Sequence, residues 1–310
     1  MSPARYRRVV EVALAALALI VVTGAAVRLT RSGLGCTDWP TCEEGRLAPE
    51  WSFHGWVEFG NRLITGVVSA AVIAAVLAAR WRRPRRRDLE RWAWGLVAGV
   101  LAQVLLGGVT VWLELHPVAV IGHFLLSVVL LSNAVVLLDR ARHEDPPRGG
   151  GPLATHGWAL VALAALVVVA GTVVTGTGPH GGDTRAERLP LDLTWVTRVH
   201  AGLVWAFVAT LVALAVRAAR SGRSDLVAAT RVLLVVAVAQ GGVGYLQYAL
   251  HLPPGLVLVH IVGAIAVWCG TLWLHLGVLR RPLLAHWSDG GRLPHSDRVD
   301  AGQGRQPIAR

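Results

Sequence analysis

The chain has 310 residues, 54% of them hydrophobic, and its mean hydropathy is +0.52. This composition excludes an ordinary water-soluble domain and indicates a membrane protein with several spans. The formal net charge is +11, and arginine carries all of the formal positive charge because the chain contains no lysine. The arginines gather in short loops, as the positive-inside rule describes for cytoplasmic loops, and no basic soluble face with aromatic residues indicates nucleic acid binding.

Eight apolar stretches reach about the 20 residues that a helix needs to cross hydrocarbon. The first is interpreted as an uncleaved span, because it is long for the apolar core of a signal peptide. Arginine-rich segments flank alternate ends of the spans, so we expect a multi-pass protein of the cell membrane with cytoplasmic N- and C-termini. The sequence thus predicts an all-α membrane protein with eight transmembrane helices, at residues 9–28, 57–79, 93–114, 117–138, 154–176, 195–217, 226–249 and 254–279.

The connections divide these helices into two predicted four-helix bundles. Tight turns at 116–117 and 251–254 make spans three and four, and spans seven and eight, antiparallel neighbours. A polar, glycine-rich joint at 144–151 separates the two halves. We therefore predict a first bundle at residues 1–145, a second at residues 152–285, and a disordered polar tail at residues 286–310.

Polar residues recur at matched positions in the two halves. Gln103 precedes His123 by 20 residues, and Gln240 precedes His260 by the same number. Glycines that allow close helix packing follow both glutamines. Because both halves run in the same direction, we predict two pseudo-symmetric bundles related by an axis along the membrane normal.

A histidine inside hydrocarbon is costly and is therefore a functional-site candidate. His200 begins the sixth span and His260 lies early in the eighth, and both spans start on the outer side. The two imidazoles are thus predicted at similar depth, where they could hold one haem iron from both faces. The alternative is a pair of histidines hydrogen-bonded within a polar core.

The first half departs from this pattern. Asn61 stands where His200 predicts a histidine, so His123 is the one histidine ligand expected there. An iron held by one histidine keeps an open position for dioxygen chemistry, whereas a bis-histidine iron suits electron transfer. Glu58 shares a helix face with Asn61, and Arg62 lies one turn beyond Glu58. Glu58 is then either half of an interfacial ion pair or a carboxylate placed beside a cofactor.

Three segments carry longer motifs. The first outer loop reads RLTRSGLGCTDWPTC over residues 28–42, the second span opens with EFGNR over residues 58–62, and the third outer loop reads TGTGPHGGD over residues 175–183. Together with the eight spans, these segments resemble the haem A synthase family over about residues 9–280. Such enzymes oxidise the C8 methyl group of haem O to a formyl group, which gives the haem A of cytochrome oxidase.

The resemblance implies a role for each matching residue. Glu58 matches the catalytic glutamate, and His123 matches an axial ligand of the substrate haem. His200 and His260 match the axial iron ligands of a haem B prosthetic group. The family pattern has a histidine in place of Asn61, and we predict that Asn61 instead lies on the distal side of the substrate haem as a hydrogen-bonding residue.

The outer ends of the spans add further candidates. Cys36 and Cys42 match the outer-loop cysteine pair of the family, which implies a disulfide that holds this loop over the first-half pocket, on a side where disulfides persist. Arg62, Arg28 and Arg198 lie near outer helix ends, where a guanidinium could bind a haem propionate. The alternative for these arginines is ordinary snorkelling at the interface.

The sequence therefore predicts a haem A synthase with substrate haem O in the first bundle and haem B in the second. Expected partners are haem O, haem A, a haem O synthase, an unidentified electron donor and the lipid bilayer. The main alternative is a di-haem b-type membrane electron carrier that acts with quinone, although a pure carrier has no need of Glu58 beside an under-ligated iron. A transporter is a third possibility, but it leaves the matched histidines unexplained.

Overall fold

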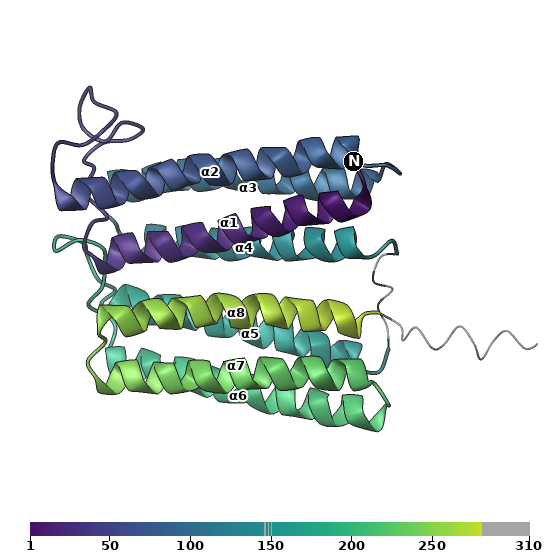
Figure 1. Ribbon diagram of the computed structural model, residues 1–310. Coiled ribbons are helices and arrows are strands. Elements are labelled where there is room, and N and C mark those ends of the chain that lie inside the picture. The colour runs from purple at the N-terminus through teal and green to yellow at the C-terminus, as the bar shows by residue number, and fades with distance from the viewer. Residues whose placement is uncertain (146, 148, 150, 281–310) are drawn as a thin grey trace, which may run out of the picture. The chain divides into compact units, whose positions relative to one another are not determined.

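The computed structural model describes residues 1–280 except 146, 148 and 150. The predicted tail at 286–310, the C-terminus and the end of the predicted second domain therefore lie outside the described residues. The described part confirms the predicted fold class, because it holds eight helices long and apolar enough to cross a membrane (Figure 1). They are α1 (Pro3–Leu29), α2 (Phe53–Trp81), α3 (Arg87–Trp112), α4 (Pro117–Arg142), α5 (Ala154–Thr177), α6 (Leu193–Arg220), α7 (Ser224–Ala249) and α8 (Pro254–Val278).

Five of the eight described helices begin before the apolar stretch that predicted them, and polar side chains cap some of these starts. Ser52 begins α2 by accepting a hydrogen bond from the Gly55 amide at 3.1 Å. Asp192 begins α6 by accepting one from the Trp195 amide at 2.6 Å. Such side chains satisfy the amides that a helix start leaves free. These helices therefore extend beyond the apolar stretches of the sequence.

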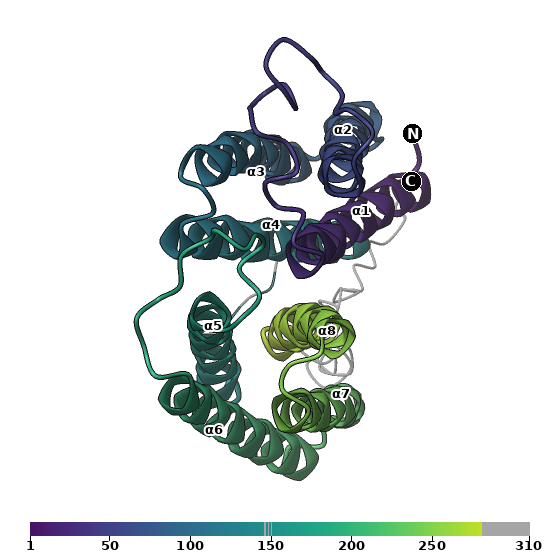
Figure 2. The same cartoon turned by 90° about the vertical axis from the view of Figure 1, so that its left-hand side faces the viewer.

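The eight helices form two closed rings of four (Figures 1 and 2). Helix α1 packs against α2 and α4, and α3 packs against the same two helices. In the second ring, α5 and α7 pack in the same way against α6 and α8. The two-bundle arrangement is thus confirmed. Residues 1–280 nevertheless form one compact unit, and the predicted domain boundaries at 145 and 152 stay predictions.

The contacts between the bundles follow the internal repeat. The bundles meet through α1 with α8, α4 with α5, and α4 with α8. If each helix is replaced by its equivalent in the other half, the contact of α1 with α8 becomes that of α5 with α4. The contact of α4 with α8 becomes itself. Because equivalent helices also run in the same direction (Figure 1), the pairing fits a two-fold pseudo-axis parallel to the helices.

The two tight turns share an uncommon backbone. Glu114 and Leu115 have φ of 49° and 61°, and His251 and Leu252 have φ of 59° and 63°. Residues other than glycine seldom adopt this left-handed region. In each turn the second residue donates its amide to the carbonyl five residues earlier, at 2.8 and 2.7 Å. This turn also ends α3 at Trp112, earlier than predicted.

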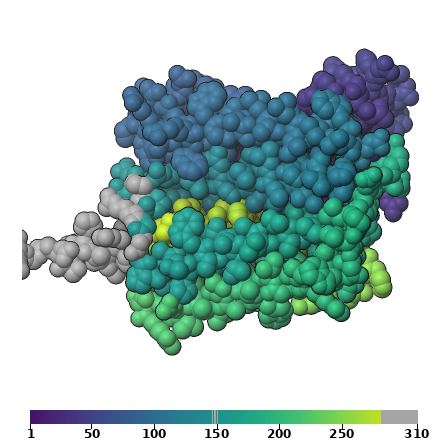
Figure 3. Space-filling model, turned by 180° about the vertical axis from the view of Figure 1, so that it is seen from behind, coloured from purple at the N-terminus to yellow at the C-terminus, as the bar shows by residue number. Residues whose placement is uncertain are grey.

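Each ring has its own apolar core, and α8 contributes to both. Ile265 and Trp273 of α8 pack against the core of the first ring, while Leu274 belongs to the core of the second. The indole of Trp268 donates a hydrogen bond to Ser132 Oγ of α4 at 3.0 Å. Figure 3 shows α8 in the seam between the two bundles. Helices α4 and α8 therefore form the main structural link between the rings.

A buried ion pair closes this link at the end of the bundles that holds the N-terminus. Asp139 of α4 is 3% exposed, and Arg280 after α8 donates to both of its carboxylate oxygens. The ring of His143 lies 3.2 Å from the same carboxylate. Arg280 also donates to the Asp145 carbonyl at 3.0 Å. The sequence did not predict this cluster, because Asp139 and Arg280 each lie just beyond a predicted span and no local pattern joins them.

We predict that Asp139→Asn destabilises the protein by about 3 kcal/mol, because removing one partner leaves a buried charge without compensation. The thermal unfolding midpoint of the purified protein in detergent would then fall by several degrees. Asp225→Asn is the matched control, since the Asp225 carboxylate that pairs with Arg223 is exposed, and ion pairs of exposed carboxylates contribute little. Equal midpoints for the two variants would contradict the role given to Asp139.

Candidate functional site

Four polar side chains inside the membrane region pack against glycines of the preceding helix. A Cβ built on each glycine would lie between 3.1 and 3.9 Å from the side chain that faces it. A small residue allows this approach, which a larger one would block. The contact is the same in all four places and joins Gly24 with Asn61, Gly107 with His123, Gly171 with His200, and Gly244 with His260. The sequence repeat indicated the glycines that follow the two glutamines, without revealing what they touch.

The 20-residue spacing also has a physical cause. Gln103 of α3 donates a hydrogen bond from Nε2 to the backbone carbonyl of His123 at 3.1 Å. Gln240 of α7 donates the equivalent bond to the carbonyl of His260 at 2.5 Å. In each bundle a side-chain amide thus ties the histidine-bearing turn to the neighbouring helix. These bonds set the height and rotation of both histidines.

His200 and His260 face one another across the second bundle. Their ring centres are 6.4 Å apart, and the ring planes make an angle of 68°. An imidazole nitrogen binds a metal at about 2 Å, so two rings on opposite sides of one ion have centres roughly 6 Å apart. Nδ1 of His200 lies 3.0 Å from the carbonyl of Val167 and therefore carries its proton toward that acceptor. This arrangement leaves Nε2 free, as is usual for metal-binding histidines.

The residues at this pair fit a haem. No three His, Cys, Asp or Glu side chains gather as a metal site in the described ranges, so the pair offers two ligands only. A porphyrin supplies the remaining ligands and needs axial residues alone. Nδ1 of His260 is buried without a hydrogen-bond partner, which argues against the alternative of a satisfied polar core. Haem B ligation by the pair stays a prediction.

The equivalent place in the first bundle holds one imidazole and one amide. Oδ1 of Asn61 accepts a hydrogen bond from Thr23 Oγ1 at 2.8 Å, while Nδ2 points toward Gly24. Nδ2 makes no hydrogen bond within the described chain. His123, whose Nδ1 is buried without a partner, comes from α4. The sequence did not single out Thr23, although it lies next to a glycine of the repeat.

Glu58 lies beneath the first outer loop. One carboxylate oxygen accepts the Cys36 amide at 2.8 Å, and the other accepts Arg62 Nη2 at 2.6 Å. The residue is 7% exposed. Arg62 also donates from Nη1 to the carbonyls of Asp38 and Thr41, at 3.0 and 2.8 Å. The ion pair proposed as the simpler alternative is therefore present, and the predicted contact of Arg62 with a propionate stays a prediction.

The disulfide between Cys36 and Cys42 is present, and both residues are fully buried. Within the loop that it closes, Trp39 packs edge-on against Trp112 with ring centres 5.6 Å apart. Trp39 also lies over Gly108 of α3, next to the glycine that faces His123. The loop therefore covers one end of the first bundle (Figure 2), and the disulfide holds it in that position.

The three candidate arginines differ in their surroundings. Arg62 is engaged with the disulfide loop, and Arg198 is exposed on α6. Arg28 lies one turn beyond Gly24 on α1, and its Nε is buried without a hydrogen-bond partner. A buried donor without an acceptor is costly. Of the three, Arg28 is therefore the arginine whose environment best fits a bound carboxylate.

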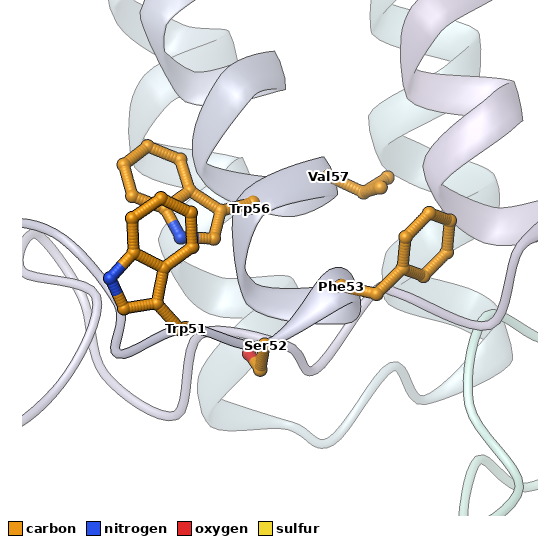
Figure 4. Close-up of a pocket in the computed structure, with 5 residues that line it drawn as sticks. All are labelled: Trp51, Ser52, Phe53, Trp56 and Val57. Carbon is orange, nitrogen blue, oxygen red and sulfur yellow. The ribbon is translucent and has the colours of Figure 1, made fainter.

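A hollow of about 490 Å³ lies at the start of α2. Figure 4 shows the residues that line it: Trp51, Ser52, Phe53, Trp56 and Val57. None of these five side chains ionises or binds metal, and Trp51 is 95% exposed. Aromatic residues of this kind are typical of the membrane–water interface. We therefore assign this hollow to the protein surface and not to the candidate site.

The two sites also differ at the position one helical turn before Asn61 and His200. Glu58 precedes Asn61 by three positions, and Thr197 precedes His200 by three. A carboxylate of the first bundle is thus replaced by a hydroxyl in the second. Oγ1 of Thr197 is buried without a partner. The sequence had predicted the change at Asn61 but not this second difference.

Comparison with known proteins identifies the family. The model of the COX15-CtaA family, described as cytochrome oxidase assembly protein, matches residues 7–181. The heme A synthase of Geobacillus thermodenitrificans is 36% identical over 136 residues, which cover 43% of this chain and 42% of that protein. The heme A synthase of Symbiobacterium thermophilum is 29% identical over 175 residues, which cover 53% of this chain and 57% of that protein. The chain thus spans about half the length of these curated relatives.

The residues matched by the family model cover the first bundle and α5. The match includes nearly all of α1, the whole of α2 to α5, and therefore Glu58, Asn61, His123 and the disulfide loop. His200 and His260 lie beyond it, and the second site is indicated by the way these two rings face one another. Because the match extends over more than half of its residues, the chain belongs to the COX15-CtaA family of cytochrome oxidase assembly proteins.

Proposed function

We propose that this chain is a haem A synthase, an oxidoreductase that converts the C8 methyl group of haem O to a formyl group. The observation that carries the proposal is the difference between two sites of the same construction. One offers two facing imidazoles, and the other offers a single imidazole with an amide and a carboxylate. The relatives named heme A synthase support the same activity.

The second site would hold haem B between His200 and His260. Gln240 fixes the turn that carries His260, and the Val167 carbonyl orients the ring of His200. The bound cofactor supplies one-electron redox chemistry, for which two axial histidines are suited. The residues of the chain contribute position, ring orientation and a water-poor surrounding.

The first site would hold haem O. His123 is its proposed axial ligand, Arg28 would bind a propionate, and the free Nδ2 of Asn61 would donate a hydrogen bond on the distal side. Two successive oxidations by dioxygen would take the methyl group through an alcohol to the formyl group; together they use two dioxygen molecules, four electrons and four protons and release three waters. The electron donor supplies the electrons, and Glu58 is the residue proposed to steer or accept protons at the reacting carbon, because its oxygens retain lone pairs besides those used by Cys36 and Arg62.

The alternative, a di-haem b-type carrier that acts with quinone, explains the two sites less well. A carrier would benefit from two similar iron sites, whereas the first bundle lacks the second imidazole. It also buries Glu58, whose counterpart in the second bundle is Thr197. A buried charge requires compensating contacts, and an electron carrier gains nothing from it.

The eight described helices that can span a membrane make the chain a multi-pass membrane protein. We further propose that it lies in the cell membrane, with the arginine-rich loops and the N-terminus on the cytoplasmic side. A haem O synthase that delivers the substrate and an electron donor of unidentified class would be its partners, with haem A as the product.

Pigment analysis tests the proposed activity. Co-expression of the full chain with a source of haem O should yield haem A in the extracted pigments. We predict that Glu58→Gln lowers haem A formation by at least about a hundredfold, the lower range for loss of a general acid or base. The reduced-minus-oxidised spectrum of the second-bundle haem should be unchanged, because Glu58 lies in the other bundle.

His251→Ala, in the exposed turn after α7, serves as the control and should form haem A normally. Haem A formation by Glu58→Gln at the wild-type rate would remove the proposed role of Glu58. A wild-type chain that binds haem but yields no haem A would favour the electron carrier instead.

The glycine contacts lead to a second prediction. Gly244→Val places a branched side chain where a Cβ would already lie 3.1 Å from the His260 ring. We expect about a tenfold loss of haem B per protein, in line with the strain of overpacking. Gly241→Val is the matched control, because a Cβ at Gly241 meets nothing within 4 Å. Haem content is measured by the pyridine haemochrome method. Equal haem content in the two variants would contradict the placement of haem B beside His260.

A third prediction concerns the distal residue. Asn61→Ala removes the free amide, and loss of one hydrogen bond to the reacting centre should lower haem A formation by about tenfold. Ser69→Ala on the same helix is the control, since its hydroxyl donates within the helix, to the Thr65 carbonyl. The rate of haem A formation per bound substrate is measured for both variants, and Ser69→Ala should match the wild type. Unchanged turnover in Asn61→Ala would show that Asn61 has no such role.

A further inference from the structure

Arg231 is a charge on the lipid-facing side of α7. It lies seven residues after the first residue of the helix, Ser224, which is roughly 10 Å along the axis at about 1.5 Å per residue. Its side chain is exposed and shares a helix face with the exposed residues Val235 and Val238. Arg231 has no ion pair or hydrogen bond within the described chain. A charge at this depth needs a partner.

A hollow lies beside this arginine. It measures about 350 Å³ and is lined by Ala219, Gly222, Ser224, Val227, Ala228 and Arg231. It forms between the end of α6 and the first two turns of α7, where small side chains leave space. Gly222 has a φ of +68° and turns the chain between the helices, and a Cβ at this position would meet nothing within 4 Å.

The charges around the hollow are predominantly positive. Arg220 is exposed at the end of α6 and has no ion pair in the part of the chain described. Asp225 is the acidic side chain of this turn, and Arg223 already binds it at 2.7 Å. A ligand here would therefore be an anion. Because apolar valines continue the same helix face, the ligand would also have an apolar part.

We propose that this hollow binds one phospholipid with an anionic headgroup. Its phosphate would pair with the guanidinium of Arg231, and its acyl chains would lie along the exposed valines of α7. Basic hollows between transmembrane helices recognise lipid headgroups in this way, through charge and location together. The site lies on the second bundle, at the helix ends opposite the disulfide loop, and does not depend on the proposed haem chemistry.

Native mass spectrometry of the full chain in detergent, titrated with phosphatidylglycerol, tests the proposal. Arg231→Gln should lower the affinity of the tightest lipid by about fivefold, which corresponds to ~1 kcal/mol for one basic residue near a lipid phosphate. Arg91→Gln is the matched control, because Arg91 is an exposed arginine in the first turns of α3 and does not line the hollow. It should bind as the wild type does.

Further experiments distinguish a lipid phosphate from free phosphate and test whether the hollow itself is needed for binding. Ala228→Trp keeps the charge but fills the hollow, and it should also weaken phosphatidylglycerol binding. Phosphatidylcholine should bind more weakly than phosphatidylglycerol, and millimolar inorganic phosphate should not compete. Equal affinity of Arg231→Gln and the wild type, no effect of Ala228→Trp, no preference between the two lipids, or competition by phosphate would each overturn the proposal.

Discussion

The hydrogen bond from a glutamine side chain to the carbonyl of a histidine determines the geometry of both bundles. Hydrocarbon offers no water to satisfy polar groups, so a glutamine within it must find a partner in the protein. Gln103 and Gln240 find theirs at the turn that carries the proposed ligand. A shift of one residue would rotate that turn by about 100° and point the imidazole out of the bundle. The glycine opposite each ring then provides the space in which the imidazole lies.

A repeated scaffold can carry two chemistries because few positions distinguish its halves. The helix order, the tight turns and the glycine contacts are shared, whereas Asn61 replaces His200 and Glu58 replaces Thr197. These exchanges alter what each site can bind without altering how the helices pack. Stability and function are therefore encoded by different residues, and the pseudo-symmetry survives although the sites have diverged.

Much of this architecture could be predicted from the sequence, because its signals are local or periodic. Span length predicted the helices, and the positions of His200 and His260 near the starts of two parallel spans predicted that their imidazoles would lie at similar depth. The contacts of Arg62 with loop carbonyls, of Thr23 with Asn61 and of Asp139 with Arg280 could not be predicted. They depend on how a loop folds back or on how distant helices meet, and no short-range pattern reports either.

The buried carboxylate and the disulfide loop occur in the same bundle for a physical reason. Glu58 bears a charge that burial would penalise strongly without hydrogen bonds to both oxygens. The Cys36 amide supplies one of these bonds, and Arg62, which also binds the loop carbonyls, supplies the other. The second bundle places Thr197 at this position, and the sequence of its outer loop contains no cysteine. The loop is thus part of the site, because it makes a charged group tolerable where the proposed chemistry requires one.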